Sequence, residues 1–207
     1  MRILMTLSLL VIGMNIQAQK VYLAENGVTI RASADAVAGD IVEIKGDTFL
    51  IVDDAMLTFF KNNNIELSQI ASSLVTTLVT DMNSMFLGSS AFNQDISSWD
   101  VSNVTDMSDM FAAAMNFNQD ISSWDVGQVT NMVGMFAQAS TFNQDISSWD
   151  VSQVSIMRGM FNGATAFNQN LSKWNVGKVN NCIYFNEKSA LVSAHLPKFT
   201  NCNPNAN

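Results

Sequence analysis

A repeat of 25 residues constrains the fold of this chain more than any other feature of its sequence. The string FNQDISSWDVS begins at Phe92, recurs as FNQDISSWDVG at Phe117 and FNQDISSWDVS at Phe142, and returns as FNQNLSKWNVG at Phe167. Such a period is typical of a solenoid, in which each repeat is one coil that buries its apolar side by stacking on the next. We therefore expect a stack of about five coils over residues 63–181, the first of them divergent.

One segment of each repeat has the apolar spacing of a strand. Ile96, Trp99 and Val101 follow the pattern L-x-x-L-x-L, and the pattern recurs in the later copies. Trp and Val then share one side of a strand, because strand side chains alternate with a period of two. Each coil is expected to contain one short strand here.

The next segment has the spacing of a helix. Met107, Met110, Phe111 and Ala114 fall at i, i+3, i+4 and i+7, which forms an apolar face along two helical turns. A column of residues that favour helix N-termini precedes it: Thr80, Thr105, Thr130, Ser155 and Asn180. The expected fold class is thus an α/β repeat solenoid, with leucine-rich-repeat-like coils of short strand plus short helix.

Two aromatic columns are expected to form the repeat core. Tryptophan occupies a core position of the strand, and phenylalanine closes each coil on the far side. A buried tryptophan removes about 150–250 Å² from water, so each one stabilises the stack strongly. The residues are Trp99, Trp124, Trp149, Trp174, Phe92, Phe117, Phe142 and Phe167.

The segment before the repeats does not repeat and is expected to form a cap over residues 19–62. Asn26-Gly27 is a two-residue hairpin signal, and Lys45-Gly46-Asp47 indicates a second hairpin. Asp53 or Asp54 then caps a short helix that runs through Phe60.

Residues 1–18 have the pattern of an export signal. Arg2 precedes the apolar run Ile3–Met14, and Ala18 is a small residue before a cleavage point. The alternative is a buried N-terminal helix. The apolar run is shorter than the roughly 20 residues that a membrane span needs, so no transmembrane segment is expected in the mature chain. We expect the protein to be secreted or to lie at the cell surface.

Export favours a disulfide between the two cysteines, Cys182 and Cys202. They lie in residues 182–207, which are expected to form a degenerate last coil that serves as the C-terminal cap.

Charge and motifs exclude several functions. The formal net charge of −8 argues against nucleic acid, which requires clustered Lys and Arg. No phosphate loop, metalloprotease motif or nucleophile elbow is present, and the single histidine, His195, is expected in the cap rather than in catalysis. We expect no enzyme activity and no cofactor, although an enzyme acting on an extracellular polymer remains a third hypothesis.

Polar residues also form rows along the stack. Asn93 and its equivalents are expected to serve the stack through hydrogen bonds rather than to contact a ligand, and the neighbouring Gln94 row is expected to face outward. Asp95 and Asp100 each begin an acidic row, which is expected to be a solvated face. The alternative is Ca²⁺ binding, because carboxylates suit that ion, although the spacing matches no known calcium loop.

The repeat resembles that of a known family. WDVSNVTDMSDMF together with FNQDIS resembles the 25-residue repeat of BspA-like leucine-rich-repeat surface proteins, a type also seen in mycoplasma lipoproteins. The flanking NGVTIRASADAVAGDIVEIKGDTFLIVD and LPKFTNCNP resemble the flanks of such repeats. The resemblance implies a secreted or surface-exposed bacterial protein with a leucine-rich-repeat-like fold, and some members are implicated in adhesion.

These observations together predict a monomeric, non-enzymatic binding or adhesion module. It would hold an extracellular protein or glycan through many weak contacts on a repetitive polar face. A Ca²⁺-dependent structural or adhesion protein is the alternative function. The expected contact residues are Ser98, Asp100, Ser102, Ser123, Asp125, Ser148, Asp150 and Ser152.

Overall fold

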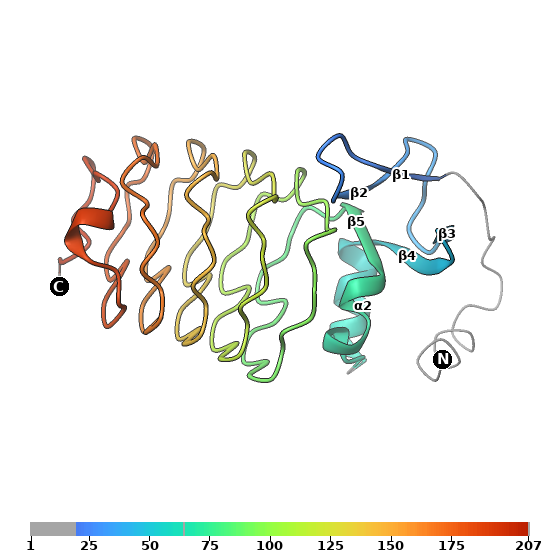
Figure 1. Ribbon diagram of the computed structural model, residues 1–207, viewed down its shortest axis with the longest axis horizontal. Helices are drawn as coiled ribbons and strands as arrows, with labels where there is room; N and C mark the ends of the chain where they lie inside the picture. Colours follow the sequence, from blue (N-terminus) through green and yellow to red (C-terminus); the bar gives the residue numbers. More distant parts are fainter. Residues whose placement is uncertain (1–19, 64, 207) are drawn as a thin grey trace.

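The protein is described by a computed structural model that covers residues 20–63 and 65–206 (Figure 1). The export signal expected over residues 1–18 lies outside the described residues. Two small sheets and an α-helix form the N-terminal end, and a row of turn-rich coils lies side by side from there to the C-terminus. We number the coils 1 (81–105), 2 (106–130), 3 (131–155) and 4 (156–180).

Both N-terminal hairpins are present. Strand β1 (Val21–Leu23) pairs antiparallel with β2 (Ile30–Ala32). The predicted two-residue turn at Asn26-Gly27 is wrong, because residues 24–29 connect the strands and only Gly27 of the pair has a positive φ, 73°. Strand β3 (Ile41–Ile44) pairs antiparallel with β4 (Asp47–Asp53). Lys45 and Gly46 both have positive φ, as a two-residue turn between twisted strands requires.

Helix α2 (Asp54–Asn62) follows β4 directly. Asp53 is its N-cap, and the carboxylate accepts a hydrogen bond of 2.8 Å from the backbone N–H of Met56. Two short 3₁₀ helices, η1 (Leu67–Gln69) and η2 (Ala71–Ser73), lead into β5 (Leu74–Leu78). β5 pairs parallel with β4, so the sheet order β3-β4-β5 carries the chain from the cap into coil 1.

The predicted α/β solenoid of strand-plus-helix coils is wrong. Regular structure in the described residues consists of two small sheets, one α-helix and short 3₁₀ turns, and the coils are built from turns. In coil 1, Ser97 and Ser98 form a turn where a continuous strand was expected. In coil 2, successive turns over residues 108–113 replace the helix.

Left-handed backbone conformations explain the missing helix. Two columns of residues, four positions apart, have φ between 54° and 73° in successive coils. The columns are Ser84, Asp109, Gly134, Gly159 and Tyr184, and Gly88, Ala113, Gln138, Gly163 and Lys188. Because a left-handed residue ends a right-handed helix, no helical turn can propagate between them.

Hydrogen bonds between coils replace those of a helix. In coil 1 the N–H groups of Met82, Ser84 and Phe86 each donate to a carbonyl of coil 2 at 2.9 Å. The expected N-cap column has the same role. Thr105 donates its N–H to the carbonyl of Thr80 at 2.9 Å, and its hydroxyl lies 3.3 Å from the same oxygen. The threonine column therefore joins coils to each other and caps no helix.

The aromatic columns lie in the core between the coils. Every tryptophan of the column is at most 5% exposed and every phenylalanine at most 3%. The rings of Trp124 and Trp149 are nearly parallel, with centroids 6.5 Å apart, and Phe117 and Phe142 stack at 5.8 Å. The indole N–H of Trp124 donates to the carbonyl of Ile96 in the preceding coil at 3.2 Å, so each tryptophan also satisfies a buried backbone acceptor.

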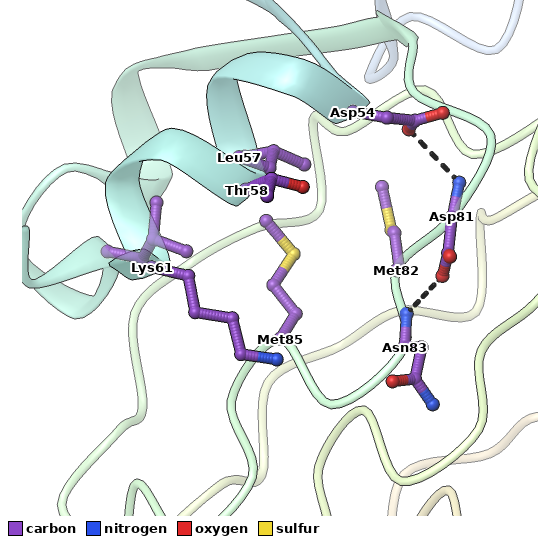
Figure 2. A pocket seen from close by; sticks show the side chains of 9 residues that line it. Asp54, Leu57, Thr58, Lys61, Asp81, Met82, Asn83 and Met85 are labelled. Atoms are coloured by element: carbon purple, nitrogen blue, oxygen red, sulfur yellow. Dashed lines mark hydrogen bonds between the residues drawn. The ribbon is translucent and has the colours of Figure 1, made fainter. Parts of the chain in front are cut away.

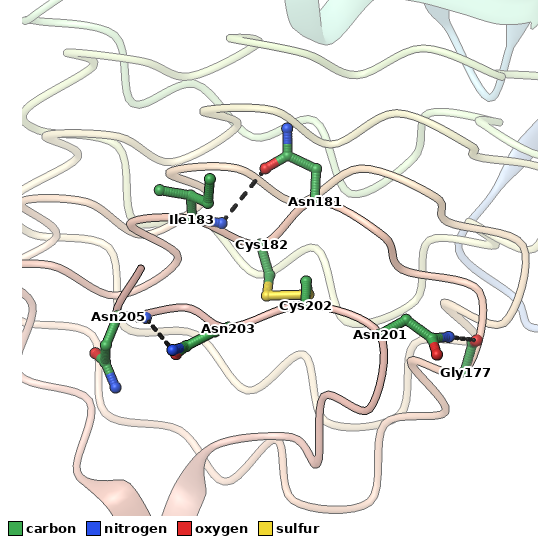
Figure 3. Close-up of a disulfide and its surroundings, with 8 residues drawn as sticks. All are labelled: Gly177, Asn181, Cys182, Ile183, Asn201, Cys202, Asn203 and Asn205. Carbon is green, nitrogen blue, oxygen red and sulfur yellow. Dashed lines mark hydrogen bonds between the residues drawn. A yellow bond between two sulfur atoms is a disulfide. The ribbon is translucent and has the colours of Figure 1, made fainter. Parts of the chain in front are cut away.

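Each end of the stack is closed by residues that take the place of a missing coil. Asp54 of α2 accepts hydrogen bonds from the N–H and hydroxyl of Thr80 at 2.8 and 2.5 Å. At the other end, Cys182 and Cys202 form a disulfide, and Asn201 donates to the carbonyl of Gly177 at 2.7 Å (Figure 3). The last segment is thereby fixed against coil 4.

Candidate functional site

The acidic rows form turns on the surface of the stack. One oxygen of Asp95 accepts a hydrogen bond from the N–H of Ser97 at 2.9 Å, and one oxygen of Asp100 accepts from the N–H of Ser102 at 3.2 Å. The same bond recurs at Asp120, Asp125, Asp145 and Asp150. A side-chain oxygen that bonds the backbone two residues on defines an Asx turn, so these carboxylates fix the local path of the chain.

Coil 4 shows that the turns need an oxygen but no charge. Asn170 accepts from the N–H of Ser172 at 3.0 Å, and Asn175 accepts from the N–H of Gly177 at 3.3 Å. These asparagines stand 25 residues after Asp145 and Asp150 and make the same contact. Replacing Asp by Asn in coils 2 and 3 is therefore expected to remove charge while keeping the turn.

Hydrogen bonds from serine shift the acidity of three of these residues. The hydroxyl of Ser122, and then its backbone N–H, lower the pKa of Asp120. Ser147 and Ser152 lower the pKa values of Asp145 and Asp150 in the same way. Each of the three carboxylates is exposed, so it stays ionised in water at neutral pH.

These shifts predict a pH dependence of stability. A carboxyl whose folded pKa lies below its unfolded value of about 3.9 stabilises the fold above that pH, and the contribution is lost as the pH falls through the folded pKa. We expect the melting temperature of the protein to fall between about pH 5 and pH 2. The triple variant D120N/D145N/D150N should show a flatter fall in thermal melts monitored by circular dichroism, and identical curves would contradict this assignment.

In coil 1 the expected contact residues are partly covered by the N-terminal hairpin. The carboxylate of Asp100 is 2% exposed and lies 3.4 Å from Nε of Arg31 in β2. The carbonyl of Ser98 accepts a hydrogen bond of 2.8 Å from the N–H of Ile30, and Ser102 is half-buried. The sequence did not predict that the hairpin covers these residues, because no local pattern shows where the hairpin packs.

In coils 2 and 3 the equivalent residues form a row. Asp125, Ser148 and Asp150 are exposed, and Ser123 and Ser152 are half-buried. Consecutive coils thus present the same carboxylate on one face, held by an Asx turn above a buried aromatic core. This row is the candidate site.

The Asn and Gln rows form a hydrogen-bond ladder. The side chain of Asn118 accepts from the N–H of Asn143 at 3.0 Å, and Gln144 donates to the carbonyl of Asn118 at 2.9 Å. The Gln row lies at the surface, exposed at Gln94 and half-buried in the later coils, and its amides also bond the preceding coil. His195 continues the ladder past coil 4, with Nδ1 lying 2.9 Å from the carbonyl oxygen of Asn168.

A small cleft lies between α2 and the start of coil 1 (Figure 2). Its volume is about 180 Å³, and Asp54, Leu57, Lys61, Met82 and Met85 are among the residues that line it. Pockets for small molecules commonly occupy about 300–1,000 Å³. The cleft is too small to displace the exposed row as the candidate site.

The described residues contain no group of three or more His, Cys, Asp or Glu arranged to hold a metal ion. Within residues 20–63 and 65–206, no helix has the length and apolar content of a membrane span.

Comparison with known families places the repeats in a described family. The model for DUF285, described as a Mycoplasma protein of unknown function, matches residues 54–152 and again residues 109–199. The matches begin at α2 and cover all four coils and most of the C-terminal segment. Comparisons with curated proteins and with solved structures gave no match.

Proposed function

The chain belongs to the DUF285 family of Mycoplasma proteins of unknown function, and from that premise we propose that it is an exported, non-enzymatic binding module. Its partner is an extracellular protein or glycan, held by the exposed row of polar turns. We also propose a relation to BspA-like surface proteins, which rests on the sequence of the repeat. The pattern of residues 1–18 supports secretion or display at the cell surface.

The observation that carries this proposal is the recurrence of one polar turn on successive coils. Asp125 and Asp150 are exposed at equivalent positions, and each is held by a hydrogen bond to the backbone two residues on. A partner that contacts one coil can contact the next in the same way, so weak contacts add up without a deep pocket. The ordering cost is small, because the turns are already fixed in the free protein.

A binding screen tests the proposal. The protein without its export signal is immobilised and presented to purified extracellular matrix proteins and a glycan array. We expect at least one saturable binder whose affinity falls about tenfold in D125N/D150N, because two charged contacts are lost together. The variant D120N/D145N removes the same charge from the other acidic row and is expected to bind as the parent does.

A screen without any saturable binder would count against the proposal. Equal losses in the two double variants would show that binding depends on overall charge, which would also contradict a specific row. Circular dichroism of both variants is the control for folding, since asparagine keeps the same turn in coil 4.

A further inference from the structure

Strand β2 already occupies one copy of the repeated turn. Its residue Ile30 donates a backbone hydrogen bond of 2.8 Å to the carbonyl of Ser98 in coil 1. The next residue, Arg31, places Nε 3.4 Å from Oδ2 of Asp100. An extended segment with an arginine therefore contacts the turn at two points, a main-chain acceptor and an acid.

The contact between Arg31 and Asp100 is an ion pair in which the acid is shielded from water. Asp100 is 2% exposed and the Arg31 side chain is 34% exposed. The second carboxylate oxygen of Asp100 has no hydrogen-bond partner within the described residues, and neither has Nε of Arg31. The guanidinium is thus the group that faces this buried oxygen and balances its charge.

Coils 2 and 3 carry the same two groups, a serine carbonyl and a carboxylate. Ser123 and Asp125, and then Ser148 and Asp150, lie 25 and 50 residues after Ser98 and Asp100. Both carboxylates are exposed. Within residues 20–63 and 65–206, no donor bonds the carbonyl of Ser123 or of Ser148.

The spacing of the coils suits an extended strand. Equivalent ring centroids of coils 2 and 3 are 5.6 to 6.5 Å apart, and the longest of these distances joins Trp124 and Trp149, which directly precede the two acids. Residues i and i+2 of a strand lie about 6.6 Å apart and point to the same side. Side chains at alternate positions of one strand are therefore spaced nearly as successive coils are.

Coil 4 ends the row. It carries Lys173 in place of the serine and Asn175 in place of the acid. Lysine repels an arginine, and asparagine has no charge with which to attract one. The row thus provides two consecutive acidic positions.

We propose that the row formed by Asp125 and Asp150 binds an extended protein segment with arginine at alternate positions, in the manner of β2 on coil 1. This inference rests on the proposed function and names the chemistry of the partner. The strand supplies backbone N–H donors to the carbonyls of Ser123 and Ser148, and its arginines pair with the two carboxylates. The net charge of −8 favours the approach of such a cationic segment.

A synthetic peptide tests the proposal directly. The peptide Thr-Ile-Arg-Val-Arg-Ala-Ser extends the β2 pattern by a second arginine, and a peptide with citrulline at both arginine positions is its neutral counterpart. We expect saturable binding of the arginine peptide by the whole exported protein. Affinity should fall about tenfold for the citrulline peptide and for D125N/D150N, with backbone amide NMR shifts at residues 125–127 and 150–152.

Two further variants serve as controls. D120N/D145N carries the same net charge as D125N/D150N and should bind the arginine peptide as the parent does. The variant K173S/N175D adds a third acidic position, so it should bind a three-arginine peptide more tightly than the parent. Absence of peptide binding, equal loss in both double variants, or equal binding of the citrulline peptide would each overturn the inference.

The outcomes also separate this inference from the proposed function. A glycan or an uncharged protein that binds in the screen, with no binding of the arginine peptide, would leave the binding module intact and reject the arginine strand as its ligand.

Discussion

Replacing Trp124 by alanine lowers the free energy of unfolding by about 3–5 kcal/mol, the range found for large-to-small aromatic substitutions in cores. Trp124 is 3% exposed and stacks between Trp99 and Trp149 at 6.4 and 6.5 Å. Alanine leaves a cavity between coils and also removes the donor to the carbonyl of Ile96, which lies 3.2 Å from the indole nitrogen. Urea unfolding monitored by tryptophan fluorescence and circular dichroism measures the change.

Phenylalanine at the same position separates the two contributions. W124F keeps an aromatic ring in the stack but has no N–H group to bond Ile96. Its free energy of unfolding should therefore lie between those of the parent and W124A. A loss below about 1 kcal/mol for W124A, the size of an ordinary surface effect, would contradict a core position for this residue.

Removing the disulfide is expected to cost about 3 kcal/mol. Cys182 and Cys202 are separated by 20 residues, and a loop of that length gives this value in the loop-entropy model. The double variant C182S/C202S should unfold at lower urea than the parent. In native-state hydrogen exchange it should lose protection first at Tyr184, whose N–H bonds the carbonyl of Pro204 at 2.9 Å.

Reduction of the parent protein is the matched control, because it breaks the same bond without changing Cys182 to serine in the core. Both treatments should destabilise the C-terminal segment while the coil 1 amides stay protected under native conditions. Equal stability of reduced and oxidised parent would show that the segment is held by its packing alone.

The N-terminal hairpins, the helix cap and the disulfide could be predicted from the sequence. Lys45-Gly46 is a two-residue turn whose conformation follows from local chemistry, and Asp53 caps a helix from the preceding position. Asn26-Gly27 marked the place of the first hairpin but not the length of its connection. Each of these features is decided within a few residues. The pairing of Cys182 with Cys202 followed from the expectation of export.

The conformation of the coils could not be predicted in this way. The spacing of Met107, Met110, Phe111 and Ala114 fits a helix, and all four are buried. The signal against a helix lies in the positive φ columns, where glycine appears in only some coils. Left-handed backbone costs about 1–2 kcal/mol for other residues, and hydrogen bonds between coils, which the sequence does not display, offset this cost.

The candidate site was predicted in part. The Asp-x-Ser spacing, as at Asp150 and Ser152, is itself a signal for an Asx turn. The same turn explains why asparagine can replace the acids in coil 4. Burial of Asp100 beneath Arg31 depends on where the hairpin docks, and only the folded chain provides that.

Asp54 and His195 close the two ends of the stack of coils. Neighbouring coils exchange backbone hydrogen bonds in both directions, as when Met82 donates to the carbonyl of Asp106 and Asn116 donates to that of Ser90. An uncapped stack would therefore expose donors and acceptors that another molecule of the same chain can bond. Asp54 provides the oxygen that a preceding threonine would offer to Thr80, and His195 fills the place of the next glutamine beside Asn168. Because Asp54 and His195 contact only the ends of the stack, whole repeats can be inserted or deleted between them. The row of polar turns would then lengthen or shorten by one coil at a time, with both ends unchanged.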